Sequence, residues 1–244
     1  MRLFDAHAHL QNYPGRTELD DAFARASASG VRLTLCNGTR PEDWESVLLV
    51  ASGREGVLPF LGLHPWFAEK AGAGWLELLE RSLLRLPSGI GEIGLDKVSD
   101  QDFVRQEEVF RAQLGLARKL GRPAAIHCVK AWGRLTEILK EEKPPAFMLH
   151  AYGGPPEMTE ELACLGAYFS FGGGLTDPGR KKLRSSLLCA PPERLLFETE
   201  APSQWELTGV LDAAASVLGQ TPGSLGELSW NNARTFLGDI FPDL

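Results

Sequence analysis

The feature of this sequence that most restricts its possible folds is a regular alternation of short apolar runs and longer stretches with helical spacing. Short runs of aliphatic and β-branched residues begin near positions 2, 31, 57, 89, 123, 146, 167 and 194. The longer stretches between them carry apolar residues three or four apart, as from Phe103 through Phe110 to Leu120, which is the spacing of an amphipathic helix. Strands that alternate with helices pair in parallel through right-handed crossovers. Eight such units in 244 residues predict one α/β domain over residues 1–244, a (β/α)8 TIM barrel, because that fold takes about 250 residues.

An open, doubly wound sheet is the alternative architecture for the same alternation. Such a sheet commonly carries a G-x-G-x-x-G loop after its first strand, and none follows the first apolar run of this chain. The barrel is therefore the preferred prediction. The helical spacing is clearest in the ranges 17–29, 41–52, 101–120, 130–140 and 207–218.

The net charge and the cysteine content limit the classes of protein to which this chain can belong. The net charge of −7 argues against a broadly basic nucleic-acid-binding surface, but it allows a phosphate substrate held through bound metal cations. No apolar run approaches the ~18 residues of a membrane span, and the N-terminal residues show no signal-peptide pattern. The 4 cysteines form no C-x-x-C pair and are expected to be reduced. We expect a cytoplasmic enzyme with no membrane contact and no obligate protein partner.

The histidines carry the strongest functional signal. The chain has only 5 of them, and each lies at or just after the end of a predicted strand. Residues two apart in a strand point to the same side, so an H-x-H pair can grip one cation. The carboxyl ends of barrel strands converge on one rim, where the active site lies. These histidines therefore predict a metal site rather than isolated polar residues at strand ends; they are His7, His9, His64, His127 and His150.

Two acidic segments end predicted strands in the same way. Glu92 lies between Gly91 and Gly94 at the end of the fourth strand, and Glu198 and Glu200 end the eighth strand before Pro202. A carboxylate can bridge two cations with its two oxygens, and a neighbouring acid can orient a ligand. The alternative for each is an acid in a solvated loop or turn. Asp96 is expected to cap its loop or to lie outside the ligands.

Imidazole and carboxylate ligands suit Zn, Mn, Ni, Fe or Mg. Two such cations can lower the pKa of a bound water toward ~7 and so allow hydrolysis without a serine or cysteine nucleophile. No G-x-S-x-G, P-loop or H-E-x-x-H motif competes for that role.

The histidines and acids lie in motifs that follow one another along the chain. The motifs are FDAHAHL at 4–10, GLHP at 62–65, GEIGLD at 91–96, IH at 126–127, LH at 149–150 and ETEAP at 198–202. This ordered set resembles the TatD family of metal-dependent hydrolases, and the resemblance runs from residue 3 to about residue 237. It implies a TIM barrel of the amidohydrolase-like superfamily with a two-metal centre, and an activity as a metal-dependent deoxyribonuclease, often a 3′-to-5′ exonuclease acting on DNA ends.

The resemblance also implies roles for individual residues. His7 and His9 would bind the first of two divalent metal ions, Glu92 would bridge both, and His127 and His150 would bind the second. The residue in the position of Glu200 would bind the first metal and accept a proton from the attacking water. His64 would lie near the phosphate or leaving group rather than on a metal.

Two departures from the family pattern leave alternatives open. The family usually has Asp where this chain has Glu200, and the extra methylene moves the carboxylate by about a bond length, to which reaction geometry is sensitive. The family commonly has Arg where this chain has Val129, followed by Lys130, which can grip a phosphate only as a point charge. The alternatives are a hydrolase of a small amide or lactone, and a catalytically weak metal-binding member of the family.

Three further features could contribute to substrate binding. Trp66, Trp132 and Trp205 could stack on bases, although packing of loops over the barrel is preferred for them. The run Phe171–Gly174 could offer backbone N–H groups to a phosphate. The only dense basic cluster, Arg180 to Lys182 with Arg184, is expected to be a solvated helix face that could also guide an anionic chain.

Overall fold

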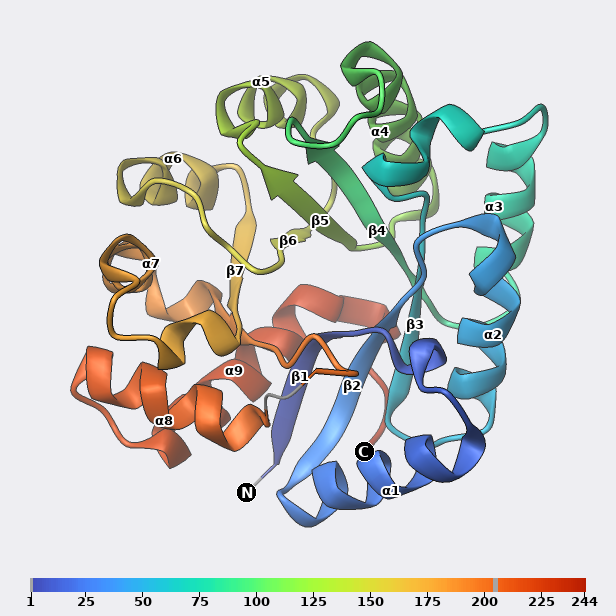
Figure 1. The fold of residues 1–244 in the computed structure, drawn as a ribbon. Helices are drawn as coiled ribbons and strands as arrows, with labels where there is room; N and C mark the ends of the chain where they lie inside the picture. The colour runs from blue at the N-terminus through green and yellow to red at the C-terminus, as the bar shows by residue number, and fades with distance from the viewer. Residues whose placement is uncertain (1, 204–205) are drawn as a thin grey trace.

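The computed structural model describes residues 2–203 and 206–244 as a barrel of parallel strands surrounded by helices (Figure 1). The strands follow one another around a single sheet in chain order, and every neighbouring pair is parallel. The strands are β1 (Leu3–Ala8), β2 (Val31–Asn37), β3 (Val57–Leu61), β4 (Gly89–Asp96), β5 (Ala124–Val129), β6 (Phe147–Leu149), β7 (Ala167–Phe171) and β8 (Leu195–Phe197).

The last strand returns to the first and closes the barrel. The closing contacts lie just beyond β8, where Ala201 bridges Ala8 and accepts a hydrogen bond from the backbone of His9 at 2.5 Å. The backbone N–H of Glu200 donates to the carbonyl of His7 at 3.0 Å. The prediction of a (β/α)8 barrel is therefore confirmed, and the open-sheet alternative is excluded.

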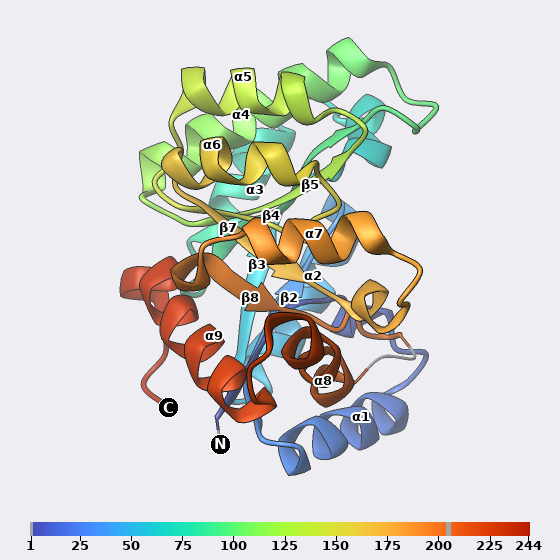
Figure 2. The same ribbon diagram turned by 90° about the vertical axis from the view of Figure 1, so that its left-hand side faces the viewer.

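Helices form an outer ring, with one after each strand, and the last strand is followed by a second helix near the C-terminus (Figures 1 and 2). The predicted helices are present, two with the predicted ends and three with shifted ends. The helix predicted from residue 101 begins at Phe103 because the Asp102 side chain caps it by accepting from the Arg105 N–H at 3.0 Å. The helices are α1 (Arg16–Ala28), α2 (Pro41–Ser52), α3 (Trp75–Leu83), α4 (Phe103–Leu120), α5 (Trp132–Glu142), α6 (Thr159–Cys164), α7 (Lys181–Cys189), α8 (Leu207–Leu218) and α9 (Pro222–Leu237).

Helix α9 closes the end of the barrel at which the strands begin. Phe236 lies with its ring centroid 6.4 Å from that of Phe60 and 5.2 Å from that of Tyr168. The Asn232 side chain donates to the carbonyl of Leu195 at 2.9 Å, at the start of β8. The opposite end, where the strands finish, is left for the site. None of the helices in the described ranges is long and apolar enough to cross a membrane.

Candidate metal centre

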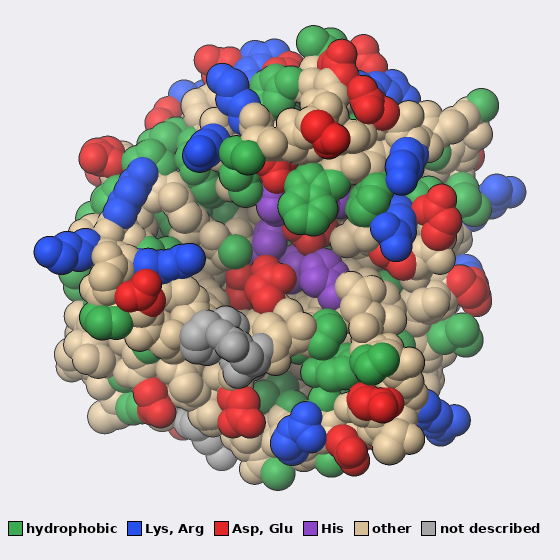
Figure 3. Space-filling view, viewed as in Figure 1, with side chains coloured by type: hydrophobic (Ala, Val, Ile, Leu, Met, Phe, Trp, Pro, Cys, Tyr) green, Lys and Arg blue, Asp and Glu red, His purple; other side chains and the backbone are tan. Residues whose placement is uncertain are grey.

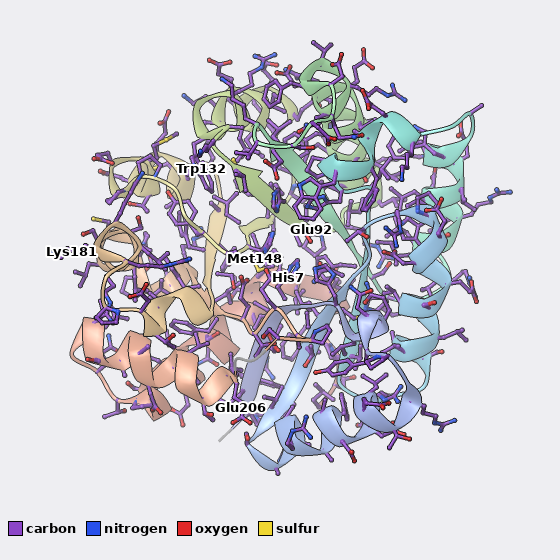
Figure 4. The ribbon with its side chains drawn as sticks, in the orientation of Figure 1. His7, Glu92, Trp132, Met148, Lys181 and Glu206 are labelled. Carbon is purple, nitrogen blue, oxygen red and sulfur yellow. The ribbon has the colours of Figure 1, made fainter. Side chains whose placement is uncertain are left out.

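Seven side chains meet where the strands end, at the mouth of the barrel. Figure 3 shows histidine and acidic side chains at the bottom of a hollow there, and Figure 4 shows His7 and Glu92 near its centre. The structure brings together every residue predicted to hold metal, along with His64. This group, called the rim cluster below, consists of His7, His9, His64, Glu92, His127, His150 and Glu200.

Glu92 lies at the centre of the rim cluster and divides its two oxygens between two pairs of histidines. Its Oε2 is 3.2 Å from His7 Nε2 and 3.4 Å from His9 Nε2. Its Oε1 is 2.7 Å from His150 Nε2 and 3.0 Å from His127 Nδ1. Burial alone would raise the pKa of the Glu92 carboxyl, but electrostatic interactions and hydrogen bonds with the surrounding histidines, foremost His150, outweigh that effect and hold the pKa well below its usual value. The carboxylate is therefore charged and has one oxygen facing each pair.

Three of these histidines are held from behind by an oxygen atom. His9 Nδ1 lies 2.8 Å from the carbonyl of Asn37, and His127 Nε2 lies 3.3 Å from Asp96 Oδ2. His150 Nδ1 lies 2.8 Å from Glu200 Oε1. An imidazole that donates its outer N–H to such an oxygen keeps a lone pair on its inner nitrogen, which is the arrangement of metal-binding histidines.

The inner atoms of the rim cluster fit cations. His7 Nε2 and His9 Nε2 lie 3.2 Å apart, and His150 Nε2 and His127 Nδ1 are also 3.2 Å apart. Lone pairs that face one another and a carboxylate in a buried site are unfavourable unless a proton or a metal ion lies between them. Among the described residues, three triads place their donor atoms within 4.8 Å of one another: His7–His9–Glu92, His64–Glu92–His127 and His7–His150–Glu200. The donor set of nitrogen and carboxylate oxygen suits Zn and similar divalent ions.

His64 differs from the other histidines because the ring nitrogen that points into the site carries the proton. The backbone N–H of Trp66 donates to His64 Nδ1 at 3.1 Å, and His64 Nε2 lies 3.2 Å from Glu92 Oε1. Burial lowers the pKa of the His64 ring, so the neutral ring carries its proton on Nε2 and donates it into the site. A nitrogen that carries a proton is a hydrogen-bond donor rather than a metal ligand.

Glu200 reaches the rim cluster from the loop after β8. Its Oε1 contacts His150 and its Oε2 is 3.9 Å from His9 Nε2, while its side chain remains 34% exposed. Burial favours a raised pKa, but His7 and His150 outweigh it and lower the pKa of Glu200 to about 2. Its carboxylate is therefore ionised at neutral pH and faces both the histidines and the solvent.

The family of the chain follows from comparisons with known proteins. A sequence model of the family described as TatD related DNase matches residues 4–238. The chain belongs to the TatD family. The prediction of a TatD-type metal-dependent hydrolase, made from its motifs, is therefore confirmed.

Individual members of the TatD family are similar over most of the chain. An Escherichia coli K12 protein described as an uncharacterized metal-dependent hydrolase, YjjV, is 32% identical over 206 residues, which cover 82% of this chain and 80% of the relative. A Klebsiella pneumoniae protein described as a 3′-5′ ssDNA/RNA exonuclease, TatD, is 33% identical over 211 residues, which cover 82% of this chain and 78% of the relative. The crystal structure of E. coli YjjV, described as a TatD homolog, matches with a TM-score of 0.90 and 27% identity over 99% of both chains.

Four further residues were considered as possible substrate contacts from the sequence. Lys130 follows β5 and is exposed, and the described structure gives its side chain no hydrogen bond or ion pair to the rim cluster. Trp132 packs on Tyr152, with ring centroids 5.0 Å apart. Trp66, by contrast, is 53% exposed. Trp205 lies outside the described residues.

Two acids behind the rim cluster position its loops. Glu198 is buried, and its Oε1 accepts a hydrogen bond from the backbone of Ala151 at 2.7 Å. Asp5, to which the sequence analysis gave no role, accepts from the backbone of Thr199 at 2.9 Å and from its hydroxyl at 2.6 Å. Burial raises the pKa of Asp5 to about 7. The available signal for Asp5 was its place after Leu3 and Phe4 in a predicted strand, because an acid that is buried there needs a partner.

Proposed function

We propose that this chain hydrolyses phosphodiester bonds at the ends of single-stranded DNA, with two divalent cations held by the rim cluster. The observation that carries the proposal is the division of the two Glu92 oxygens between two pairs of histidines. The names of relatives such as the Klebsiella pneumoniae exonuclease support the choice of substrate.

We assign the ligands as the resemblance to the TatD family implies. His7 and His9 with Glu200 would hold one cation, His127 and His150 would hold the other, and Glu92 would bridge them. The metal would be Zn, Mn, Mg, Ni or Fe. Two bound cations would supply an activated water and would neutralise the phosphate charge.

The remaining roles fall to groups that face the open side of the site. His64, which carries its proton on Nε2, would donate a hydrogen bond to a substrate oxygen. Glu200, ionised and in contact with His150, would accept the proton of the attacking water. Lys130 would act as a point charge near the substrate.

An exposed aromatic ring beside the rim cluster favours a nucleic-acid substrate. The indole Nε1 of Trp66 donates to Asp96 Oδ2 at 2.7 Å, and the ring centroid of Trp66 lies 4.9 Å from that of His64 at an interplanar angle of 77°. Both contacts fix the orientation of a ring that is still 53% exposed. A rigid exposed indole offers a stacking surface for a base.

Cellular location and domain organisation belong to the same proposal. All four cysteines are free, and Cys164 and Cys189 are exposed. Exposed free thiols suit a reducing compartment, so we place the protein in the cytoplasm. We also treat residues 1–244 as one catalytic domain.

The test uses protein of measured metal content and a 5′-labelled single-stranded oligonucleotide. The expected result is stepwise shortening from the 3′ end, which stops on addition of EDTA and in an E92Q variant that retains the wild-type circular dichroism spectrum. Metal-loaded protein that leaves DNA intact but opens a lactone or an amide would favour the alternative hydrolase. Protein that does neither would favour the weakly catalytic metal-binding member of the family.

A further inference from the structure

A groove of about 460 Å³ lies beside the rim cluster, on the side of β7 and α7. Its volume falls within the range of roughly 300–1,000 Å³ that is typical of ligand sites. Glu200 lines it where it meets the rim cluster, whereas Arg180 and Lys182 line it from the start of α7. Because α7 belongs to the outer ring (Figure 1), the groove leads outward from the metal centre.

The two basic side chains of this groove differ from the basic residues that ion pairs hold elsewhere on the molecule. Elsewhere, Arg111, Arg134 and Lys119 each pair with a glutamate within 3.0 Å. Within residues 2–203 and 206–244, neither Arg180 nor Lys182 makes an ion pair with a carboxylate, and both are exposed. The protein has a net charge of −7, so two cations without an acidic partner beside the rim cluster are available to an anionic ligand.

Glycines leave room for two side chains that line the groove. A Cβ on Gly174 would lie 2.7 Å from Arg180 Nη1, and a Cβ on Gly172 would lie 3.3 Å from Glu198 Cγ. The guanidinium of Arg180 therefore lies directly against bare backbone. The absence of a side chain at Gly174 lets the guanidinium lie at the wall of the groove, where its N–H groups can donate charge-assisted hydrogen bonds to a phosphate.

We propose that Arg180 and Lys182 bind a second phosphate of the substrate strand, the one immediately on the 5′ side of the scissile phosphate. This inference rests on the proposed function. When a strand is cleaved at its 3′ end, the departing nucleotide carries the scissile phosphate, so every other phosphate lies on the 5′ side. A cationic groove that leads away from the metal centre therefore meets the body of the strand. Its role is to hold the strand in register.

The test is a binding cycle between protein variants and a chemically modified trinucleotide. The terminal linkage is a methylene phosphonate, which keeps its charge but resists hydrolysis, and the second linkage is either a normal phosphodiester or a neutral methylphosphonate. Binding to the metal-loaded protein is measured by fluorescence anisotropy. The proteins are wild type, R180Q, K182Q, the double variant and K181Q, the last being a matched control from the same helical turn that does not line the groove (Figure 4).

Neutralising the second linkage should weaken wild-type and K181Q binding by about tenfold, because a charge-assisted contact is lost. The same change should weaken binding to the double variant by less than about twofold. The salt dependence of wild-type binding should exceed that of the double variant by about 0.7 in log–log slope for each lost contact.

Two outcomes would overturn the inference. If K181Q weakens binding as much as R180Q and K182Q do, the effect is overall charge and not a subsite. If the neutral linkage costs the double variant as much as the wild type, the second phosphate lies elsewhere. Failure of the proposed function is distinguishable, because then the wild type would neither bind the trinucleotide nor cleave an unmodified strand.

Discussion

Glu200 stands where family resemblance leads one to expect aspartate, and the structure shows how the longer side chain is accommodated. Its backbone adopts a φ of 60°, a left-handed conformation that costs a non-glycine residue roughly 1–2 kcal/mol. From that backbone its Oε1 reaches His150 Nδ1 at 2.8 Å. The extra methylene is therefore used to make a contact within the rim cluster.

Replacing Glu200 with aspartate tests whether that contact matters. The E200D side chain would fall short of His150, so kcat/KM on single-stranded DNA should drop about 10- to 100-fold, since a displacement of ~1 Å can cost that much. Metal content is measured on the same samples, and E206D, at an exposed glutamate, serves as the control. A rise in rate would mean that the natural glutamate is a compromised proton acceptor, and an unchanged rate would mean that either acid performs the task.

Trp66 gives a second prediction about a single side chain. The W66A variant should bind single-stranded DNA about 5- to 150-fold more weakly, because stacking contributes ~1–3 kcal/mol per base. W66F keeps an aromatic face but loses the hydrogen bond to Asp96, and it should lose less affinity. Anisotropy measurements with a fluorescent oligonucleotide would refute a stacking role if W66A bound like the wild type.

Helix α4 fastens two of the loops that carry the site. The Gln113 side chain accepts from the backbone N–H of Leu63 at 2.7 Å and donates to its carbonyl at 3.1 Å. Gln106, two helical turns earlier, makes the same pair of bonds to the backbone of Asp96, at 2.8 and 3.1 Å. One helix thereby positions both His64, which follows Leu63, and the acid behind His127.

Substitution of Gln113 should therefore reduce stability and disturb the site together. Q113L keeps the approximate volume but leaves the buried N–H and carbonyl of Leu63 unpaired, at about 1–3 kcal/mol per group. Urea denaturation would measure the loss, and kcat/KM should fall with it because His64 is displaced. V104A, an exposed position on the same helix, should change stability by no more than about 0.5 kcal/mol. Equal stability of Q113L and V104A would contradict the role of Gln113.

The helices were predicted unevenly, for reasons specific to each. Ranges 41–52 and 207–218 coincide with α2 and α8, because their apolar spacing is strong and their ends are marked. Helix α9 was not predicted as a helix, since counting eight strand–helix units did not require a further one. The Phe236 side chain of α9 packs on Phe60 and Tyr168 at the end of the barrel where the strands begin, and these contacts exist only in the folded barrel.

Across the barrel as a whole, the rim cluster joins strands that are far apart in sequence. His7 lies on β1, Glu92 on β4 and His127 on β5, and Glu200 lies just beyond β8. Bound cations would therefore cross-link the mouth of the barrel. Anything that binds only the folded state raises its stability, by an amount that grows with the logarithm of the ligand concentration relative to the dissociation constant.

Removal of metal should accordingly lower the melting temperature. At 100 times the dissociation constant, one bound ion contributes about 2.7 kcal/mol, which corresponds to roughly 5–10 °C for a chain of this size. Differential scanning calorimetry of metal-loaded and EDTA-treated protein would measure the difference, and it should shrink in E92Q. A melting temperature that is indifferent to chelation would argue against ions held by the rim cluster.

Local patterns in the chain sufficed for the barrel and for most of the candidate ligands. Strand and helix periodicity depends on neighbouring residues. A histidine at the carboxyl end of a barrel strand lies at the rim where all the strands end. The spatial relations between strands could not be read in this way. The contact of Glu200 with His150, the proton on His64 Nε2 and the groove that joins Arg180 to the rim cluster each depend on the register and twist of strands separated by tens to more than a hundred residues. Those quantities are set by the packing of all eight strands at once, so they became visible only in the folded barrel.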